Sequence, residues 1–293
     1  MTFPPRRPGA VVLVLALAVA GAACGDRLPP AAGGPPARVV SLAPSVTEIV
    51  FALGAGDRLV GVCGECDHPP EAARLPRVGG WVVPSVEAVL AARPDVVFAV
   101  PSPGNHEAVL ALERAGTRVE VVHDRVLADL WDAVRRIAAV LGVPARGEQL
   151  GADLARRLDE VHARVAGLPA PRVLVVVGHD PLIVVGGGTL QDELVRLAGG
   201  VNVAADAGTA WPALPLEVVV ARAPDVIVDA AMGTDAGGRR LFARLTTVPA
   251  VRDGRVVALR DDAFLRAGPR VPDAAAELAE LLHPGLARTR DAG

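Results

Sequence analysis

The same helix–turn–strand pattern occurs in each half of this chain, and no other feature of the sequence constrains the fold as strongly. Residues 87–98 read EAVLAARPDVVF, and residues 217–228 read EVVVARAPDVIV. In both segments a glutamate begins an apolar helical run, a Pro-Asp turn ends it, and a buried strand follows. The repeat predicts one equivalent helix in each of two lobes. The glutamate in the first turn can be explained by the helix dipole alone, or by a partner that both lobes contact.

Strand and helix signals alternate along the rest of the chain. Segments with helical periodicity separate six short β-rich segments, which are residues 38–42, 95–100, 118–122, 172–177, 225–228 and 255–259. Strands interleaved with helices predict parallel sheets that are covered on both faces.

A long amphipathic segment, residues 145–168, lies between the two halves. Its apolar stripe consists of Leu150, Leu154, Leu158, Val161 and Val165. About 22 helical residues would form a rod of roughly 33 Å. Such a helix can join two lobes or cover a single domain, and the pattern leaves both interpretations open.

Residues 1–23 have the layout of a secretory signal peptide. Two arginines precede an uncharged apolar run that ends in three small residues. The run has about 15 residues, whereas a bilayer span needs roughly 20, so export is favoured over a permanent membrane anchor. The small residues before Cys24 resemble a bacterial lipobox, with Gly21 where leucine is usual, and this implies a lipidated Cys24. The Gly- and Pro-rich residues that follow read as a flexible tether.

Five motifs spread from residue 38 to residue 270 carry a family resemblance. They read RVVSLAPSVTE at 38–48, CDHPPE at 66–71, GGVN at 199–202, WPALPLE at 211–217 and RAGPR at 266–270. Together these motifs resemble the periplasmic binding proteins for cobalamin and ferric siderophores, and they are most similar to the cobalamin branch.

The resemblance implies the class III fold of that family, which is α/β, with two Rossmann-like lobes of parallel strands joined by one long α-helix. Together with the patterns described above, it leads us to expect a signal peptide at 1–23, a lipidated N-terminus and tether at 24–37, an N-terminal lobe at 38–144, a connecting helix at 145–168, a C-terminal lobe at 169–286 and a disordered tail at 287–293.

The resemblance also implies a function, that of the exported substrate-binding component of an ABC importer. Such a protein would capture a corrinoid, cobalamin or a relative, as transported ligand, with no cofactor and no resident metal. It would act as a monomer, lipid-anchored at the membrane, and deliver the ligand to a permease dimer with its ATPase. The residues expected to bind the ligand are Pro44, Ser45, His68, Trp81, Trp211, Phe264 and Arg266. Glu87 and Glu217 are expected to dock onto the permease.

The aromatic residues of this set have alternative explanations. Aromatic walls suit a broad, largely apolar ring, but core packing is the simple alternative for each tryptophan. Because Trp81 and Trp211 lie in loop segments just before the repeated helices, the cleft is favoured. His68 stands where the family has tyrosine, and it could stack on the ligand, ligate a metal or lie at the surface.

Cys63 and Cys66 form a C-x-x-C motif, which occurs in redox sites, zinc sites and disulfides. Zinc would need two more ligands nearby, and only His68 is available. A glycine and two prolines close by disfavour the helix that a thioredoxin-like site requires. With Cys24 lipidated, an even pair of cysteines remains in an oxidising compartment, which favours a disulfide.

Other classes of function are disfavoured. A formal net charge of −3 gives no electrostatic reason to expect nucleic acid. The glycines at 186–188 lack a phosphate-loop pattern, and the histidines are scattered, which argues against an enzyme and against a zinc or manganese carrier. Ferric siderophores and haem remain alternative ligands. Arg266 and Arg270 suit a siderophore, and haem would need a histidine ligand because the chain has no tyrosine.

Overall fold

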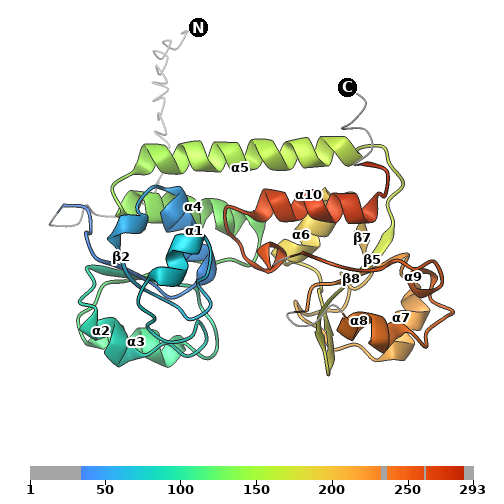
Figure 1. Cartoon of the computed structure of the whole chain (residues 1–293), viewed down its shortest axis with the longest axis horizontal. Coiled ribbons are helices and arrows are strands. Elements are labelled where there is room, and N and C mark those ends of the chain that lie inside the picture. Colours follow the sequence, from blue (N-terminus) through green and yellow to red (C-terminus); the bar gives the residue numbers. More distant parts are fainter. Residues whose placement is uncertain (1–33, 232–235, 261, 287–293) are drawn as a thin grey trace, which may run out of the picture. The chain divides into compact units, whose positions relative to one another are not determined.

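One long helix, α5 (Pro144–Val165), separates two β-sheets along the chain (Figure 1). The computed structural model describes residues 34–231, 236–260 and 262–286. The predicted signal peptide, Cys24, most of the predicted tether and the predicted tail lie outside the described residues. Residues 35–293 form one unit. Within the described ranges, no helix is both long enough and apolar enough to span a bilayer.

The first sheet is parallel throughout and has the strand order β2-β1-β3-β4. Its strands are β1 (Val39–Ser41), β2 (Leu59–Val62), β3 (Val96–Ala99) and β4 (Val119–Val121). Its helices are α1 (Pro44–Ala52), η1 (Gly56–Arg58), η2 (Pro70–Arg74), α2 (Val86–Ala91), α3 (His106–Arg114) and α4 (Leu127–Val140). Alternate residues of β1 face opposite layers, since Val39 packs with α1 and α4 while Val40 packs with α2 and α3.

The second sheet has the order β6-β5-β8-β9, and β7 also pairs with β5. Its strands are β5 (Arg172–His179), β6 (Leu182–Val184), β7 (Val201–Asn202), β8 (Val226–Asp229) and β9 (Val256–Ala258). Its helices are α6 (Leu190–Leu197), α7 (Leu216–Arg222), α8 (Ala236–Phe242), α9 (Pro249–Arg252), η3 (Ala263–Leu265) and α10 (Val271–Leu282). β6 departs from the predicted parallel arrangement, because it forms an antiparallel hairpin with β5.

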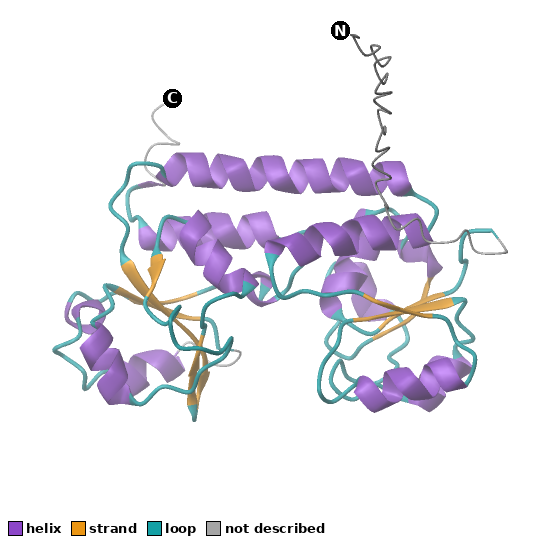
Figure 2. Ribbon diagram, turned by 180° about the vertical axis from the view of Figure 1, so that it is seen from behind, coloured by secondary structure: helices purple, strands orange, loops and turns teal. Residues whose placement is uncertain are grey.

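The helix α5 packs against α4 of the first lobe and α10 of the second. Figure 2 shows it extending over both lobes. Leu154, Leu158 and Val161 of the predicted stripe are buried, so the apolar face provides the contact. The helix ends at Val165, before the predicted residue 168, because Gly167 turns the chain with a φ of 80°. The predicted fold class, two α/β lobes joined by one long helix, is confirmed.

In both copies of the sequence repeat, equivalent hydrogen bonds attach the repeated segment to the start of a strand. Asp95 Oδ2 accepts a hydrogen bond from the backbone N–H of Arg38 at 2.8 Å, and Asp225 Oδ2 accepts one from that of Arg172 at 2.9 Å. The two guanidinium groups donate to backbone carbonyls at the ends of α2 and α7, at 2.6 and 2.7 Å. Each repeated helix is therefore tied to the start of an interior strand, β1 or β5, which fixes the position of its glutamate.

Candidate ligand-binding site

A cavity of about 260 Å³ has walls from both ends of the described chain. The first lobe supplies Ala43, Pro44, Ser45, Glu65, Trp81 and Asp124, and the segment before α10 supplies Asp262, Leu265 and Arg266. Four residues predicted to bind ligand are thereby brought together: Pro44, Ser45, Trp81 and Arg266.

The first-lobe wall is built from loops that follow parallel strands. Pro44 and Ser45 begin α1 in the segment that follows β1, Glu65 follows β2, and Asp124 follows β4. The carboxyl ends of parallel strands meet at one edge of a sheet, and ligands commonly bind there. Pro44 occupies the first turn of α1, where its missing N–H costs no hydrogen bond.

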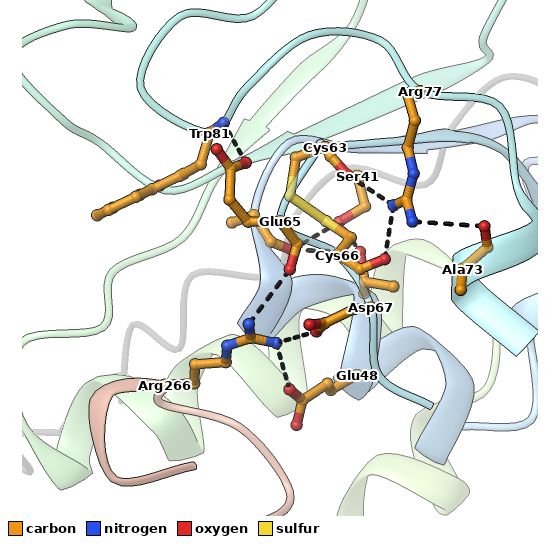
Figure 3. The surroundings of a disulfide bond; sticks show 12 residues. Ser41, Glu48, Cys63, Glu65, Cys66, Asp67, Ala73, Arg77, Trp81 and Arg266 are labelled. Carbon is orange, nitrogen blue, oxygen red and sulfur yellow. Dashed lines mark hydrogen bonds and ion pairs between the residues drawn. A yellow bond between two sulfur atoms is a disulfide. The ribbon is translucent and has the colours of Figure 1, made fainter. Parts of the chain in front are cut away.

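Trp81 is held through its backbone on two sides. Its N–H donates to Glu65 Oε2 at 2.8 Å, and its carbonyl accepts from Asn105 Nδ2 at 3.4 Å. Asn105 is buried and also donates to Val100 O at 2.8 Å. The indole is partly exposed, and Figure 3 shows it extending away from the Glu65 carboxylate. Glu65 and Asn105, which are far apart in the sequence, therefore determine the position of Trp81, whose indole forms the aromatic wall of the cavity.

Cys63 and Cys66 form a disulfide in the loop that follows β2 (Figure 3). Both sulfur-bearing residues are fully buried. The guanidinium of Arg77 donates to Cys63 O at 2.8 Å and to Cys66 O at 2.6 Å, which holds both ends of the four-residue loop. Across the described ranges, no group of three or more His, Cys, Asp and Glu side chains is placed to hold a metal ion.

Arg266 lies in a cluster of ion pairs that joins the two lobes. It contacts Glu48 at 3.5 Å and Asp67 at 2.8 Å, and it also pairs with Asp262. Only 11% of its side chain is exposed. Burial alone would raise the pKa of Asp67, but the hydrogen bond and charge of Arg266 outweigh this and hold that pKa below its usual value. The charge of Arg266 is therefore matched by carboxylates of the protein itself.

The cavity has an acidic lining that the sequence analysis did not predict. Glu65, Asp124 and Asp262 all line it. Burial raises the pKa of Asp124, the negative charge of Asp129 raises it further, and His123 opposes the change. Each of the three had a signal in the sequence: Glu65 lies inside the C-x-x-C motif, and Asp262 lies four residues before Arg266. Asp124 could have been found as the acid that follows a predicted strand.

The structure places three predicted ligand-binding residues outside the lining of this cavity. Phe264 is 1% exposed and packs in the core, so its ring is not available to a ligand there. Trp211 is 46% exposed, in a segment that pairs with β6 through the backbone of Pro212 and Ala213. His68 is partly buried, next to Asp67. Ligand contact by these three residues stays a prediction.

Glu87 and Glu217 are exposed in the first turns of α2 and α7. One helical turn later, each helix presents an exposed apolar side chain, Leu90 at 37% and Val220 at 38%. Figure 1 shows α2 and α7 on the sides of their lobes that face away from α5. The two lobes therefore present matching surfaces, each with one carboxylate and one apolar residue.

Comparisons with known proteins agree with this architecture. The profile of the family described as "Periplasmic binding protein" matches residues 39–263. The vitamin B12-binding protein of Pectobacterium atrosepticum is 32% identical over 264 residues, which cover 86% of this chain and 92% of that protein.

Two solved structures are similar over most of their length. The periplasmic heme-binding protein RhuT from Roseiflexus sp. RS-1 is 33% identical, with a TM-score of 0.77 over 85% of this chain and 98% of its own. The periplasmic vitamin B12-binding protein BtuF of Vibrio cholerae is 28% identical, with a TM-score of 0.74 over 85% and 97%. The chain therefore belongs to the periplasmic binding protein family, and it is an exported solute-binding protein rather than an enzyme.

Proposed function

We propose that this protein captures a corrinoid, cobalamin or a relative, in the cavity between its lobes and delivers it to an ABC permease. The similarity to vitamin B12-binding proteins over most of both chains supports this ligand. The ligand is transported cargo and not a cofactor. The cavity of about 260 Å³ is smaller than the sites that enclose drug-sized ligands. It therefore fits one edge of a corrin ring, with the rest of the ring between the lobes.

The acidic lining of the cavity is the observation that favours a corrinoid over haem. Haem carries ionised propionates at its edge, whereas the edge of a corrinoid carries neutral amides. Glu65 would repel a propionate, and Arg266 offers little compensation because carboxylates already surround it. The same carboxylates can accept hydrogen bonds from amide N–H groups.

Haem is the second candidate, because a haem-binding protein is 33% identical to this chain and has the same fold. Ferric siderophores are a further alternative. The ligands are distinguished by incubating the purified protein with cobalamin, cobinamide, haemin or a ferric hydroxamate and then desalting it. We expect a corrinoid spectrum to be retained. Retention of haemin or of the hydroxamate, with loss of both corrinoids, would contradict the proposal.

A matched variant tests the electrostatic argument. Glu65→Gln with Asp124→Asn removes two acidic groups from the cavity and nearly preserves its shape. This variant should gain affinity for haemin relative to cobalamin, by about tenfold if one charge–charge contact of ~1.4 kcal/mol is removed. An unchanged ratio of the two affinities would mean that the lining does not select against anionic ligands.

The partner and the membrane attachment complete the proposed function. Glu87 and Glu217 would each contact a basic site on a two-fold permease dimer. A lipid on Cys24 would hold the otherwise monomeric protein at the outer face of the membrane. Cys24→Ala should then move the exported protein from the membrane fraction to the soluble fraction and abolish its labelling by a radioactive fatty acid.

A further inference from the structure

The disulfide loop of Cys63–Cys66 contacts both walls of the cavity (Figure 3). On one side, the N–H of Gly64 donates to Gly79 O at 2.8 Å, and the Glu65 carboxylate accepts from the N–H of Trp81 at 2.8 Å. On the other side, Arg266 Nη2 donates to the backbone carbonyl of Glu65 at 3.2 Å. One short loop therefore connects an aromatic wall from the first lobe with a charged wall from the segment before α10.

The loop itself is firmly held. The disulfide closes it, Arg77 binds the carbonyls of both cysteines, and the N–H of Cys63 donates to Ser41 O at 3.0 Å. The position of Glu65 is therefore set by a covalent ring that is attached to the end of β1.

Besides Glu65, the segment that carries Trp81 is held by Asn105 Nδ2, which donates to Trp81 O at 3.4 Å, and by a hydrogen bond from the N–H of Gly80 to Val83 O at 3.0 Å. Val82 and Val83, which follow Trp81, are 46% and 72% exposed, so apolar packing contributes little there. Gly79 has a φ of 102°, and a Cβ atom on Gly80 would lie 3.2 Å from the Glu65 carboxylate. The two glycines allow the segment to approach the loop closely, and hydrogen bonds then fix where Trp81 stands.

We propose that Glu65 is a positioning residue for ligand binding, which places the Trp81 indole at the cavity wall from a loop that the Cys63–Cys66 disulfide holds in place. The role in affinity rests on the proposed function, whereas the placement of Trp81 does not. The placement of Trp81 requires an acceptor oxygen on the side chain of residue 65. Glu65→Gln therefore preserves the hydrogen bond from the N–H of Trp81, and Glu65→Ala removes it. Neither change affects the backbone carbonyl that binds Arg266.

The experiment follows Trp81 alone, in a background of Trp131→Phe and Trp211→Phe that leaves no other tryptophan. Quenching of its emission by neutral acrylamide is measured without ligand, and cobalamin affinity is measured by calorimetry. Glu65→Ala should raise the quenching constant about twofold and weaken cobalamin binding about tenfold. Glu65→Gln should recover most of both effects. The matched control is Glu71→Ala, an exposed carboxylate on η2, which should change neither quantity.

Opening the disulfide gives an independent test. In the same background, the disulfide is reduced with a phosphine in one experiment and removed by Cys63→Ser/Cys66→Ser in a second. Both should raise acrylamide quenching at least as much as Glu65→Ala, at temperatures where circular dichroism shows the protein folded. Unchanged quenching in Glu65→Ala overturns the proposal, as does Glu65→Gln behaving like Glu65→Ala. If the unsubstituted protein fails to bind cobalamin, the proposed ligand is wrong, and the quenching measurements still decide whether Glu65 places Trp81.

Discussion

Glu48 and Arg270 form an ion pair at 2.7 Å, although 222 residues separate them in the sequence. Glu48 lies on α1, and only 2% of its side chain is exposed. Arg270 immediately precedes α10, which packs along α5. Because Glu48 also contacts Arg266, one buried carboxylate fastens the segment between β9 and α10 to the first lobe. The cavity wall that Arg266 and Asp262 provide depends on this attachment.

Removing the Glu48 carboxylate should destabilise the protein strongly. Breaking a buried ion pair by deleting one partner typically costs 3–5 kcal/mol, and both arginines keep other carboxylates nearby, so Glu48→Ala should cost about 3 kcal/mol. Urea unfolding measures this as a lower midpoint at an unchanged slope. Asp67→Ala is the control, because 65% of the Asp67 side chain is exposed and its loss should cost less than about 1 kcal/mol. Equal effects of the two substitutions would refute the argument.

The two candidate tryptophans should contribute unequally to ligand affinity. Trp81 lines the cavity and is held from both sides, so Trp81→Ala should weaken cobalamin binding by at least about 1 kcal/mol. Trp211 lies outside the cavity lining, so Trp211→Ala should weaken cobalamin binding less than Trp81→Ala does. Calorimetric titration of both variants decides between these outcomes. Trp131→Phe, on the packing face of α4, is the control.

The fold could be predicted because its signals are local. The repeat, the strand–helix alternation and the stripe from Leu150 to Val165 each lie within one segment of the chain. The predicted end of α5 at residue 168 lies beyond the stripe, and the left-handed Gly167 turns the chain just after Val165, where both the stripe and the helix end. The hairpin of β6 was missed because its three residues are too few to show a period.

The site could be predicted only in part, because its residues meet through the tertiary fold. The positions of Pro44, Ser45, Trp81 and Arg266 followed from motifs, and the structure brings these residues together. The contact between Glu65 and Trp81 spans 16 residues, and that between Glu48 and Arg266 spans 218. Sequence periodicity reveals helices and strands, but it does not reveal contacts between residues so far apart in the chain. The placement of Trp81 and Trp211 in loops just before the repeated helices suggested matching roles, but Trp81 is bonded to Glu65 and Asn105, whereas the segment after Trp211 pairs with β6.

Asp124 should make stability depend on pH in the direction opposite to an ordinary ion-paired acid. Burial raises the pKa of Asp124 in the folded state above its unfolded value. The contribution of Asp124 to the free energy of unfolding is therefore fully present below its unfolded pKa, near 3.8, and is lost as pH rises through its folded pKa. Asp124→Asn should raise the melting temperature at pH 7, and the gain should vanish towards pH 3.5.

Glu120 provides the matched comparison for this pH dependence. Burial would raise the pKa of Glu120, but hydrogen bonds from Arg118 and Arg136 outweigh it and lower that pKa. Its stabilisation is present above the unfolded pKa, near 4.5, and is lost as pH falls through the folded pKa. Glu120→Gln should therefore lower the melting temperature at pH 7. If both substitutions shift the melting temperature in the same direction at pH 7, the assignment of these environments is wrong.

Replacing Glu87 and Glu217 together by arginine should abolish transport and leave the protein otherwise intact. Both carboxylates are exposed at helix starts, so the melting temperature and the ligand affinity should stay close to those of the original protein. Association with the permease in nanodiscs should fall at least about tenfold, because charges across an interface set orientation and association rate. Raising the salt concentration should weaken association of the original protein more than that of the variant.

Glu113→Arg, exposed on the neighbouring helix α3, is the control and should leave transport unchanged. If the double variant loses ligand binding in solution together with transport, these glutamates belong to the ligand site and not to the permease surface.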